Sequence, residues 1–205
     1  MNSVAKKRVL LLLCQGTEIF EASAFIDVMG WANDVGSTRI ELVSVALKPQ
    51  VVACTFGARI IADRPVAEIS VAEFDALAIP GGFETFGFYE DAYSTEIQNL
   101  IREFGALKRP IGAICVGALP LAKTGLLSGR RATTYHLDEG RRRGQLSELG
   151  ALVVDGHVVQ DGPYITSSSP GTAVEVALRL LAAITNEANA QHVRYLMGFS
   201  GPAAG

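Results

Sequence analysis

Short apolar stretches alternate with longer amphipathic stretches along the whole chain. Strands are predicted where apolar or alternating residues stand together between turn residues, at 8–14, 39–47, 74–82, 109–115, 131–136 and, as several short strands, within 151–169. Helical spacing of apolar residues predicts helices at 19–34, 94–107, 116–127, 137–150, 170–185 and 186–197. A hairpin is expected at 51–63, turning near Phe56 and Gly57. This alternation predicts a single doubly wound α/β domain, whose mostly parallel sheet lies between helices.

Composition is that of one ordinary globular domain. The chain has 205 residues, 49% hydrophobic and 19% charged, with a formal net charge of −3. That length can bury a full core, so we expect one domain over 1–205, with its core at about 7–198 and a flexible tail at 199–205. The mild acidity argues against nucleic acid or an anionic membrane as the main partner. The basic run Arg141–Arg143 is predicted to be a solvated helix face rather than a phosphate site.

Several features bear on the cellular setting. The apolar runs are far shorter than the ~20 residues that span a bilayer, and residues 1–18 do not have the pattern of a signal peptide. Three cysteines at irregular spacing form neither a disulfide framework nor a zinc pattern. We therefore expect a reducing, cytoplasmic location and no metal.

Cys115 stands where a predicted strand meets a predicted helix, in "GAICVGALPLAKTGLL". Its small neighbours, including Gly112 and Gly117, permit a tight strand-to-helix turn of the nucleophile-elbow type. A thiol at a helix start is also expected to have a lowered pKa. The alternative is a small hydrophobic residue in a buried strand. The local sequence leaves both interpretations open.

Four longer segments resemble the ThiJ/PfpI superfamily of class I glutamine amidotransferase-like proteins. They are "LLLLCQGTEIFEASAFIDVM", "CTFGARIIADRPVAEISVAEFDALAIPGG", "IGAICVGALPLAKTGLL" and "ITSSSPGTAVEVAL". Together they cover nearly the whole chain, in the right order, and are most similar to the branch around the parkinsonism-associated protein deglycase and its bacterial relatives. The resemblance implies a flavodoxin-like fold, a homodimer, and no metal or organic cofactor.

The resemblance also implies roles for particular residues. Cys115 corresponds to the nucleophile and redox-sensitive thiol, Glu21 to an acid that contacts it, and the backbone amides at Gly81, Gly82 and Val116 to an oxyanion-binding pocket. A carboxylate beside a thiolate would raise the thiol pKa, unless the acid keeps its proton and donates a hydrogen bond to sulfur. Glu21 is therefore predicted to be a protonated donor, the alternative being a solvated helix residue.

Some positions depart from the family pattern. His136 is the one histidine placed to act as a base, but in the deglycase branch a histidine directly follows the Thr-Thr pair, and Tyr135 stands there in this chain. Because strand side chains alternate faces, the offset can turn His136 away from the pocket, as a surface or dimer-contact residue. Val116 stands where related peptidases carry histidine, which disfavours peptidase activity. Ser168 and Ser169 replace an arginine and a glycine, which puts an inherited anion contact in doubt.

The remaining candidates lie around this core site. Glu18 is expected at the surface, Cys14 in the core and Cys54 near a dimer interface, whereas the aromatic loop 83–93 either walls the pocket or makes a subunit contact.

The sequence thus favours a cysteine-dependent lyase or hydrolase acting on small electrophiles, by glyoxalase-like attack on methylglyoxal or deglycase-like repair of glycation adducts. Isocyanide hydration is one alternative. A non-catalytic redox sensor or stress chaperone that uses Cys115 oxidation is another.

Overall fold

A computed structural model describes residues 6–48, 51–137 and 139–199. The strands are β1 (Lys6–Leu13), β2 (Arg39–Ala46), β3 (Val51–Ala53), β4 (Arg59–Ile61), β5 (Arg64–Pro65), β6 (Ala76–Ile79), β7 (Ile111–Ala113), β8 (Arg131–Ala132), β9 (Leu152–Val153), β10 (Val158–Asp161) and β11 (Tyr164–Ser167). The α-helices are α1 (Ile19–Val35), α2 (Phe88–Ala92), α3 (Thr95–Ala106), α4 (Ala118–Lys123), α5 (Arg141–Glu148), α6 (Ala173–Ile184) and α7 (Glu187–Leu196).

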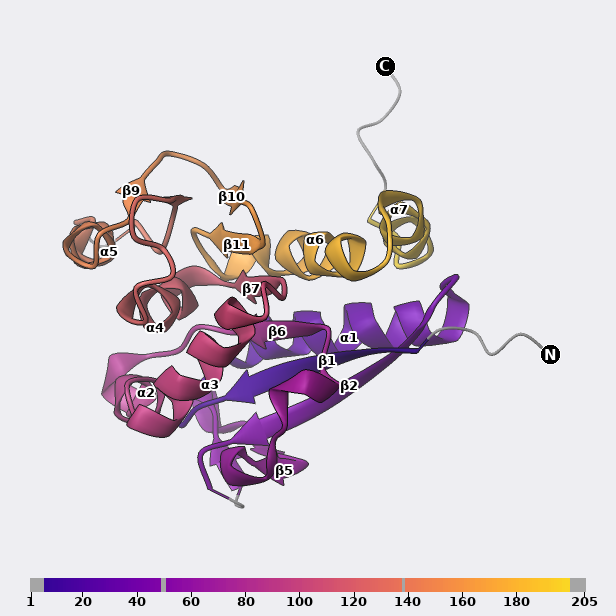
Figure 1. The fold of residues 1–205 in the computed structure, drawn as a ribbon, viewed down its shortest axis with the longest axis horizontal. Coiled ribbons are helices and arrows are strands. Elements are labelled where there is room, and N and C mark those ends of the chain that lie inside the picture. Colours follow the sequence, from indigo (N-terminus) through magenta and orange to yellow (C-terminus); the bar gives the residue numbers. More distant parts are fainter. Residues whose placement is uncertain (1–5, 49–50, 138, 200–205) are drawn as a thin grey trace.

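Within these residues a seven-stranded sheet runs in the order β10-β11-β7-β6-β1-β2-β5. All neighbouring strands in it are parallel except β10 and β11, which form an antiparallel edge. Helices α1, α6 and α7 pack together on one face of the sheet, and α3 packs with α4 on the other (Figure 1). The predicted doubly wound α/β fold, with its mostly parallel sheet, is confirmed.

The central strand β1 explains the sheet's position in the core. Residues 9–13 of β1 are completely or almost completely buried, since strands on both sides and helices on both faces cover them. A continuous apolar run is the pattern expected of such a strand. The hairpin β3–β4 also forms as predicted, with Phe56 in the left-handed region at its turn.

Several predicted elements are shorter than expected, among them the strands at 74–82 and 109–115 and the helix at 137–150. Two others adjoin the pocket described below. The strand predicted at 131–136 ends at Ala132. The next two residues form hydrogen bonds that involve side chains instead of backbone pairs between strands: Thr133 N–H donates to Thr166 Oγ1, and Thr134 Oγ1 donates to the Cys115 carbonyl. The helix predicted from 116 begins only at Ala118, after a 3₁₀ turn over Cys115–Gly117.

The chain ends bear on two expectations. The predicted flexible tail lies outside the described residues from 200 onward. Within the described ranges, none of the helices combines the length and apolar character that crossing a bilayer requires.

Candidate active site

The segments that follow the parallel strands β1, β6, β7 and β11 meet at one edge of the sheet and contribute to a pocket of about 600 Å³. Ligand sites of doubly wound sheets lie at this edge. The pocket is lined by Glu18, Glu21, Gly82, Phe83, Glu84, Cys115, Val116, Tyr135, Leu137, Arg142, Ser169 and Pro170. We call it the Cys115 pocket. Four of the six predicted site residues line it, namely Cys115, Glu21, Gly82 and Val116.

Cys115 occupies a strained turn directly after β7. Its φ is +54°, a conformation that costs a residue with a side chain roughly 1–2 kcal/mol. Hydrogen bonds hold the turn, from Ile114 N–H to the Ile79 carbonyl at 3.0 Å and from Thr134 Oγ1 to the Cys115 carbonyl at 2.8 Å. A side chain at Gly117 would come within 2.6 Å of the Ile79 carbonyl oxygen, so only glycine fits there. The tight strand-to-helix turn predicted at Cys115 is present.

Glu21 lies in the first turn of α1 and is completely buried. Its Oε2 accepts the Gly81 N–H at 2.5 Å, whereas Oε1 is buried and makes no hydrogen bond within the described residues. Burial is the main reason that the pKa of Glu21 rises to about 8, and the Gly81 N–H opposes this rise. The carboxyl group therefore keeps its proton at neutral pH, as predicted. The free oxygen can carry that proton toward a ligand.

Glu18 corrects a prediction, because it is buried rather than at the surface. It caps α1: its Oε2 accepts the Glu21 N–H at 2.8 Å, and its own N–H donates to the Gly81 carbonyl at 2.9 Å. Glutamate is not among the preferred N-cap residues, so the sequence carried no signal for this role. The cap fixes the helix start, and with it Glu21, against the Gly81 turn.

The thiol of Cys115 also corrects a prediction. Burial first, and the neighbouring Glu21 second, raise the pKa of Cys115 above its ordinary value, and the opposing effect of the Val116 N–H is smaller. The expected lowering of the Cys115 pKa by the helix start is wrong, because the thiol is only 7% exposed and burial disfavours its charged form. At neutral pH the Glu21–Cys115 pair thus holds both protons, and it loses the first with a midpoint near pH 8.

The three predicted amides have different surroundings. The Gly81 N–H is occupied by Glu21, so it positions the acid instead of facing a ligand. The Gly82 N–H has no acceptor within the described residues, and the Val116 N–H lies near the Cys115 sulfur. A side chain on Gly82 would overlap the Phe88 ring and the Gly16 carbonyl. The Gly82 amide is therefore open to an oxyanion, and the Val116 amide, which stabilises the Cys115 sulfur, belongs to the same pocket.

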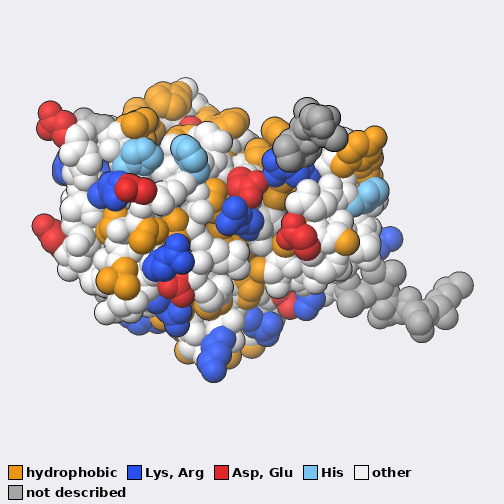
Figure 2. All heavy atoms as spheres, turned by 90° about the horizontal axis from the view of Figure 1, so that it is seen from above, with side chains coloured by type: hydrophobic (Ala, Val, Ile, Leu, Met, Phe, Trp, Pro, Cys, Tyr) orange, Lys and Arg blue, Asp and Glu red, His pale blue; other side chains and the backbone are white. Residues whose placement is uncertain are grey.

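His136 is not brought to this pocket. It lines a separate hollow of about 210 Å³ with Arg143, Asp155 and His157. Figure 2 shows one face of the molecule, on which histidine side chains lie beside basic and acidic ones. Tyr135 lines the Cys115 pocket instead. Tyr135 and His136, which are adjacent after β8, thus line different hollows. This agrees with the expectation that His136, one residue beyond the family's histidine position, is turned away from the pocket. A catalytic role for His136 has no geometric support.

Arg142 is a pocket residue that the sequence did not reveal. Its run was predicted to be solvated, but the Arg142 side chain is only 15% exposed and lines the Cys115 pocket. It pairs with Glu84 at 2.8 Å and lies over the Tyr89 ring, 5.1 Å from its centroid. Phe83 from the aromatic loop also lines the pocket, which favours the wall interpretation of that loop.

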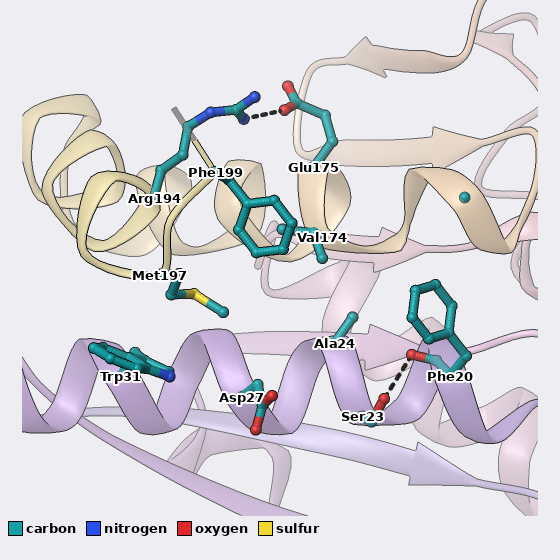
Figure 3. Close-up of a pocket in the computed structure, with 11 residues that line it drawn as sticks. Phe20, Ser23, Ala24, Asp27, Trp31, Val174, Glu175, Arg194, Met197 and Phe199 are labelled. Atoms are coloured by element: carbon teal, nitrogen blue, oxygen red, sulfur yellow. Dashed lines mark hydrogen bonds and ion pairs between the residues drawn. The ribbon is translucent and has the colours of Figure 1, made fainter. Parts of the chain in front are cut away.

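A second hollow, of about 520 Å³, lies between α1, α6 and α7. Figure 3 shows Phe20, Trp31, Met197 and Phe199 around it, with the Glu175–Arg194 ion pair at 2.7 Å on its rim. We call it the helix groove. It contains no cysteine or histidine among its lining residues. In the described part of the chain, no three His, Cys, Asp or Glu side chains gather in a way that would hold a metal ion.

Comparison with known proteins agrees with this architecture. The profile of the DJ-1/PfpI family matches residues 7–183, and the chain belongs to this family. It is 30% identical over 188 residues to protein dj-1beta of Drosophila melanogaster, covering 91% of this chain and 94% of that one. The crystal structure of Drosophila DJ-1beta superposes with a TM-score of 0.84 at 29% identity, covering 96% of this chain and 100% of that one.

Other relatives differ in length or in named activity. Protein DJ-1 homolog A of Arabidopsis thaliana is 30% identical over 93% of this chain, which spans only 46% of that protein. A Caenorhabditis elegans relative named glutathione-independent glyoxalase DJR-1.2 is 29% identical over 86% of this chain and 88% of its own length. A Pseudomonas putida isonitrile hydratase is 31% identical over 62% of this chain and 52% of its own length. The names of these two relatives correspond to two of the activities expected from the sequence, the glyoxalase reaction and isocyanide hydration.

Proposed function

We propose that this protein is a cysteine-dependent enzyme that converts small α-oxoaldehydes to hydroxy acids. The observation that carries the proposal is the pairing, in one pocket, of an elbow thiol with a buried acid that keeps its proton at neutral pH. The Gly82 amide, which has no acceptor within the described residues, and the Val116 amide, which stabilises the Cys115 sulfur, belong to the same pocket. A relative named as a glutathione-independent glyoxalase supports the same chemistry.

The first step joins the Cys115 sulfur to the aldehyde carbon. In the singly protonated pair, one proton is shared between the Cys115 sulfur and Glu21, and the reactive form is a thiolate beside the protonated acid. As the S–C bond forms, the carbonyl electron pair moves to oxygen, which is stabilised by the two amides and takes the Glu21 proton. The product is a neutral hemithioacetal, with Glu21 left as a carboxylate.

The later steps use that carboxylate as a base. Glu21 removes the proton from the former aldehyde carbon, which gives an enediol. It returns that proton to the neighbouring ketone carbon, while the hydroxyl proton moves from the first oxygen to the second, so one carbon is oxidised, the other is reduced, and a thioester results. Water then adds to the thioester carbonyl, the C–S bond breaks, and the leaving sulfur and Glu21 regain the shared proton. With methylglyoxal the product is lactate, and no external oxidant is needed.

The test is methylglyoxal consumption with lactate formation by the purified protein. Cys115→Ser should abolish turnover, whereas Cys54→Ser, a buried cysteine that does not line the pocket, should keep it. Wild-type protein without lactate formation would overturn the proposal.

Two alternative functions make different predictions in the same experiment. Turnover of an alkyl isocyanide to a formamide, with no lactate from methylglyoxal, would indicate the hydratase reaction. Selective oxidation of Cys115 by mild peroxide, with no turnover of either substrate, would favour the redox sensor. The deglycase reaction, the homodimer and the cytoplasmic location stay predictions. Light scattering at micromolar concentration tests the dimer.

A further inference from the structure

Arg142 places a largely buried positive charge in the wall of the Cys115 pocket. The same wall contains apolar residues, such as Phe83, Leu137 and Pro170. Binding pockets are mostly apolar, and a few polar groups placed in their walls orient the ligand. A guanidinium group binds a carboxylate or phosphate through two parallel hydrogen bonds, which makes it specific for such groups.

The charges around Arg142 leave it able to take another anion. Its present partner Glu84 is half exposed and is shared with Arg141, whose guanidinium lies 3.1 Å from the same Oε2. One carboxylate thus faces two guanidinium groups, so this cluster has a surplus positive charge. Of the other pocket carboxyls, Glu21 keeps its proton, and Glu18 is engaged at the helix start, where the helix dipole offsets its charge.

Glu84 is also the kind of partner that a ligand can replace. Glu84 is half exposed and regains water when it leaves Arg142, while the ligand carboxylate takes its place at the guanidinium group, so the exchange costs little. Arg141 would retain Glu84 after such an exchange, whereas Arg142 stays fixed over the Tyr89 ring and bonded to Gln145 at 3.0 Å.

We propose that Arg142 binds a carboxylate at the far end of the substrate, so that the site selects α-oxoaldehydes bearing an anionic group over neutral ones. This inference rests on the proposed function, and it names the substrate class of the same site. Arg142 would orient the dicarbonyl end of the substrate toward Cys115.

The experiment compares 4,5-dioxopentanoate, an α-oxoaldehyde with a terminal carboxylate, with methylglyoxal. We expect Arg142→Gln to lower the ratio of kcat/KM for the anionic aldehyde to that for the neutral one by about 10- to 100-fold, the range of one charge-assisted contact. Arg143→Gln is the matched control, because Arg143 is on the same helix but lines the other hollow. It should keep the wild-type ratio. Glu84→Gln, which removes the competing carboxylate, should raise the ratio.

A second measurement does not depend on turnover. Levulinate, a ketone with the same terminal carboxylate, should slow alkylation of Cys115 by iodoacetamide in the wild type but not in Arg142→Gln, and 2-butanone should protect neither. Equal protection of both proteins by levulinate, or an unchanged kcat/KM ratio in Arg142→Gln, would overturn the inference. Protection without turnover of either aldehyde would instead refute the proposed reaction and leave the anion site standing.

Discussion

The Cys115 pocket and the helix groove have similar volumes, about 600 and 520 Å³, but they differ in their lining groups. The pocket joins a thiol on a strained backbone, a buried acid and the backbone amides of Gly82 and Val116 at the ends of parallel strands. The groove joins aromatic and aliphatic side chains with one exposed ion pair between helices (Figure 3). Volume alone therefore does not identify the site. The site is identified instead by buried groups in energetically unfavourable states, such as a left-handed backbone or a buried carboxyl group. A fold maintains such groups only where the surrounding packing holds them in place.

The largest expected effect concerns the acid in the pocket. Glu21→Gln keeps the shape and a hydrogen-bond donor but cannot transfer a proton, so methylglyoxal turnover should fall by about 10²- to 10⁴-fold. The rise of wild-type kcat/KM with pH, with its midpoint near 8, should disappear with it. Asp27→Asn in the helix groove is the control and should keep both the rate and the pH profile. A full rate in Glu21→Gln would exclude Glu21 as the proton carrier.

The same acid should make stability depend on pH. Its pKa is raised from 4.5 to about 8 on folding, so folding takes up a proton between these values and the free energy of unfolding falls as pH rises through this window. At 1.36 kcal/mol per pKa unit, the loss has an upper limit of about 5 kcal/mol. Urea unfolding at pH 5 and pH 8.5 measures it. Glu21→Gln should flatten the dependence, and an unchanged slope in this variant would contradict the raised pKa.

Replacing either of two glycines by alanine should change the stability of the protein by a smaller amount, with opposite signs at the two positions. Gly82→Ala forces its new methyl group against the Phe88 ring and the Gly16 carbonyl, and should destabilise the protein by about 1–3 kcal/mol while displacing the free amide. Gly30→Ala, on α1, meets open space and should stabilise the helix by about 1 kcal/mol. Thermal unfolding and turnover of the two variants test this, and equal stability changes would contradict it.

The smallest effect is expected in the helix groove. The Glu175–Arg194 pair is partly exposed, so Arg194→Ala should cost less than about 1 kcal/mol of stability. Methylglyoxal turnover should stay at the wild-type rate. A large loss of turnover in this variant would show that the groove and the pocket are coupled.

Much of the fold could be predicted, because the spacing of apolar residues along the chain indicates which side chains are buried. The apolar run of β1, the amphipathic α3 and the hairpin β3–β4 all form where the pattern placed them. The elbow at Cys115 was also predictable, because only small residues fit a tight strand-to-helix turn. These features depend on local sequence, and local sequence was sufficient to find them.

The rest depends on distant contacts. The burial of Glu18 comes from its cap on α1 and its bond to Gly81, and the position of Arg142 in the pocket comes from how α5 packs near the aromatic loop. The raised thiol pKa follows from burial, which a helix-start argument omits. Charge runs and glutamates near helix starts are usually solvated, so the sequence offered no reason to expect these exceptions.

The backbone of Cys115 implies a trade-off between stability and activity. Its left-handed φ of +54° is a conformation that glycine adopts without cost, so at this position the reactive residue is also a less stable choice. Two variants that both lack sulfur isolate the backbone contribution: Cys115→Gly is expected to be about 1 kcal/mol more stable than Cys115→Ala. Without selection for activity, substitution of Cys115 by glycine would therefore give a more stable protein without the thiol. Only selection for the chemistry of the thiol would oppose this substitution.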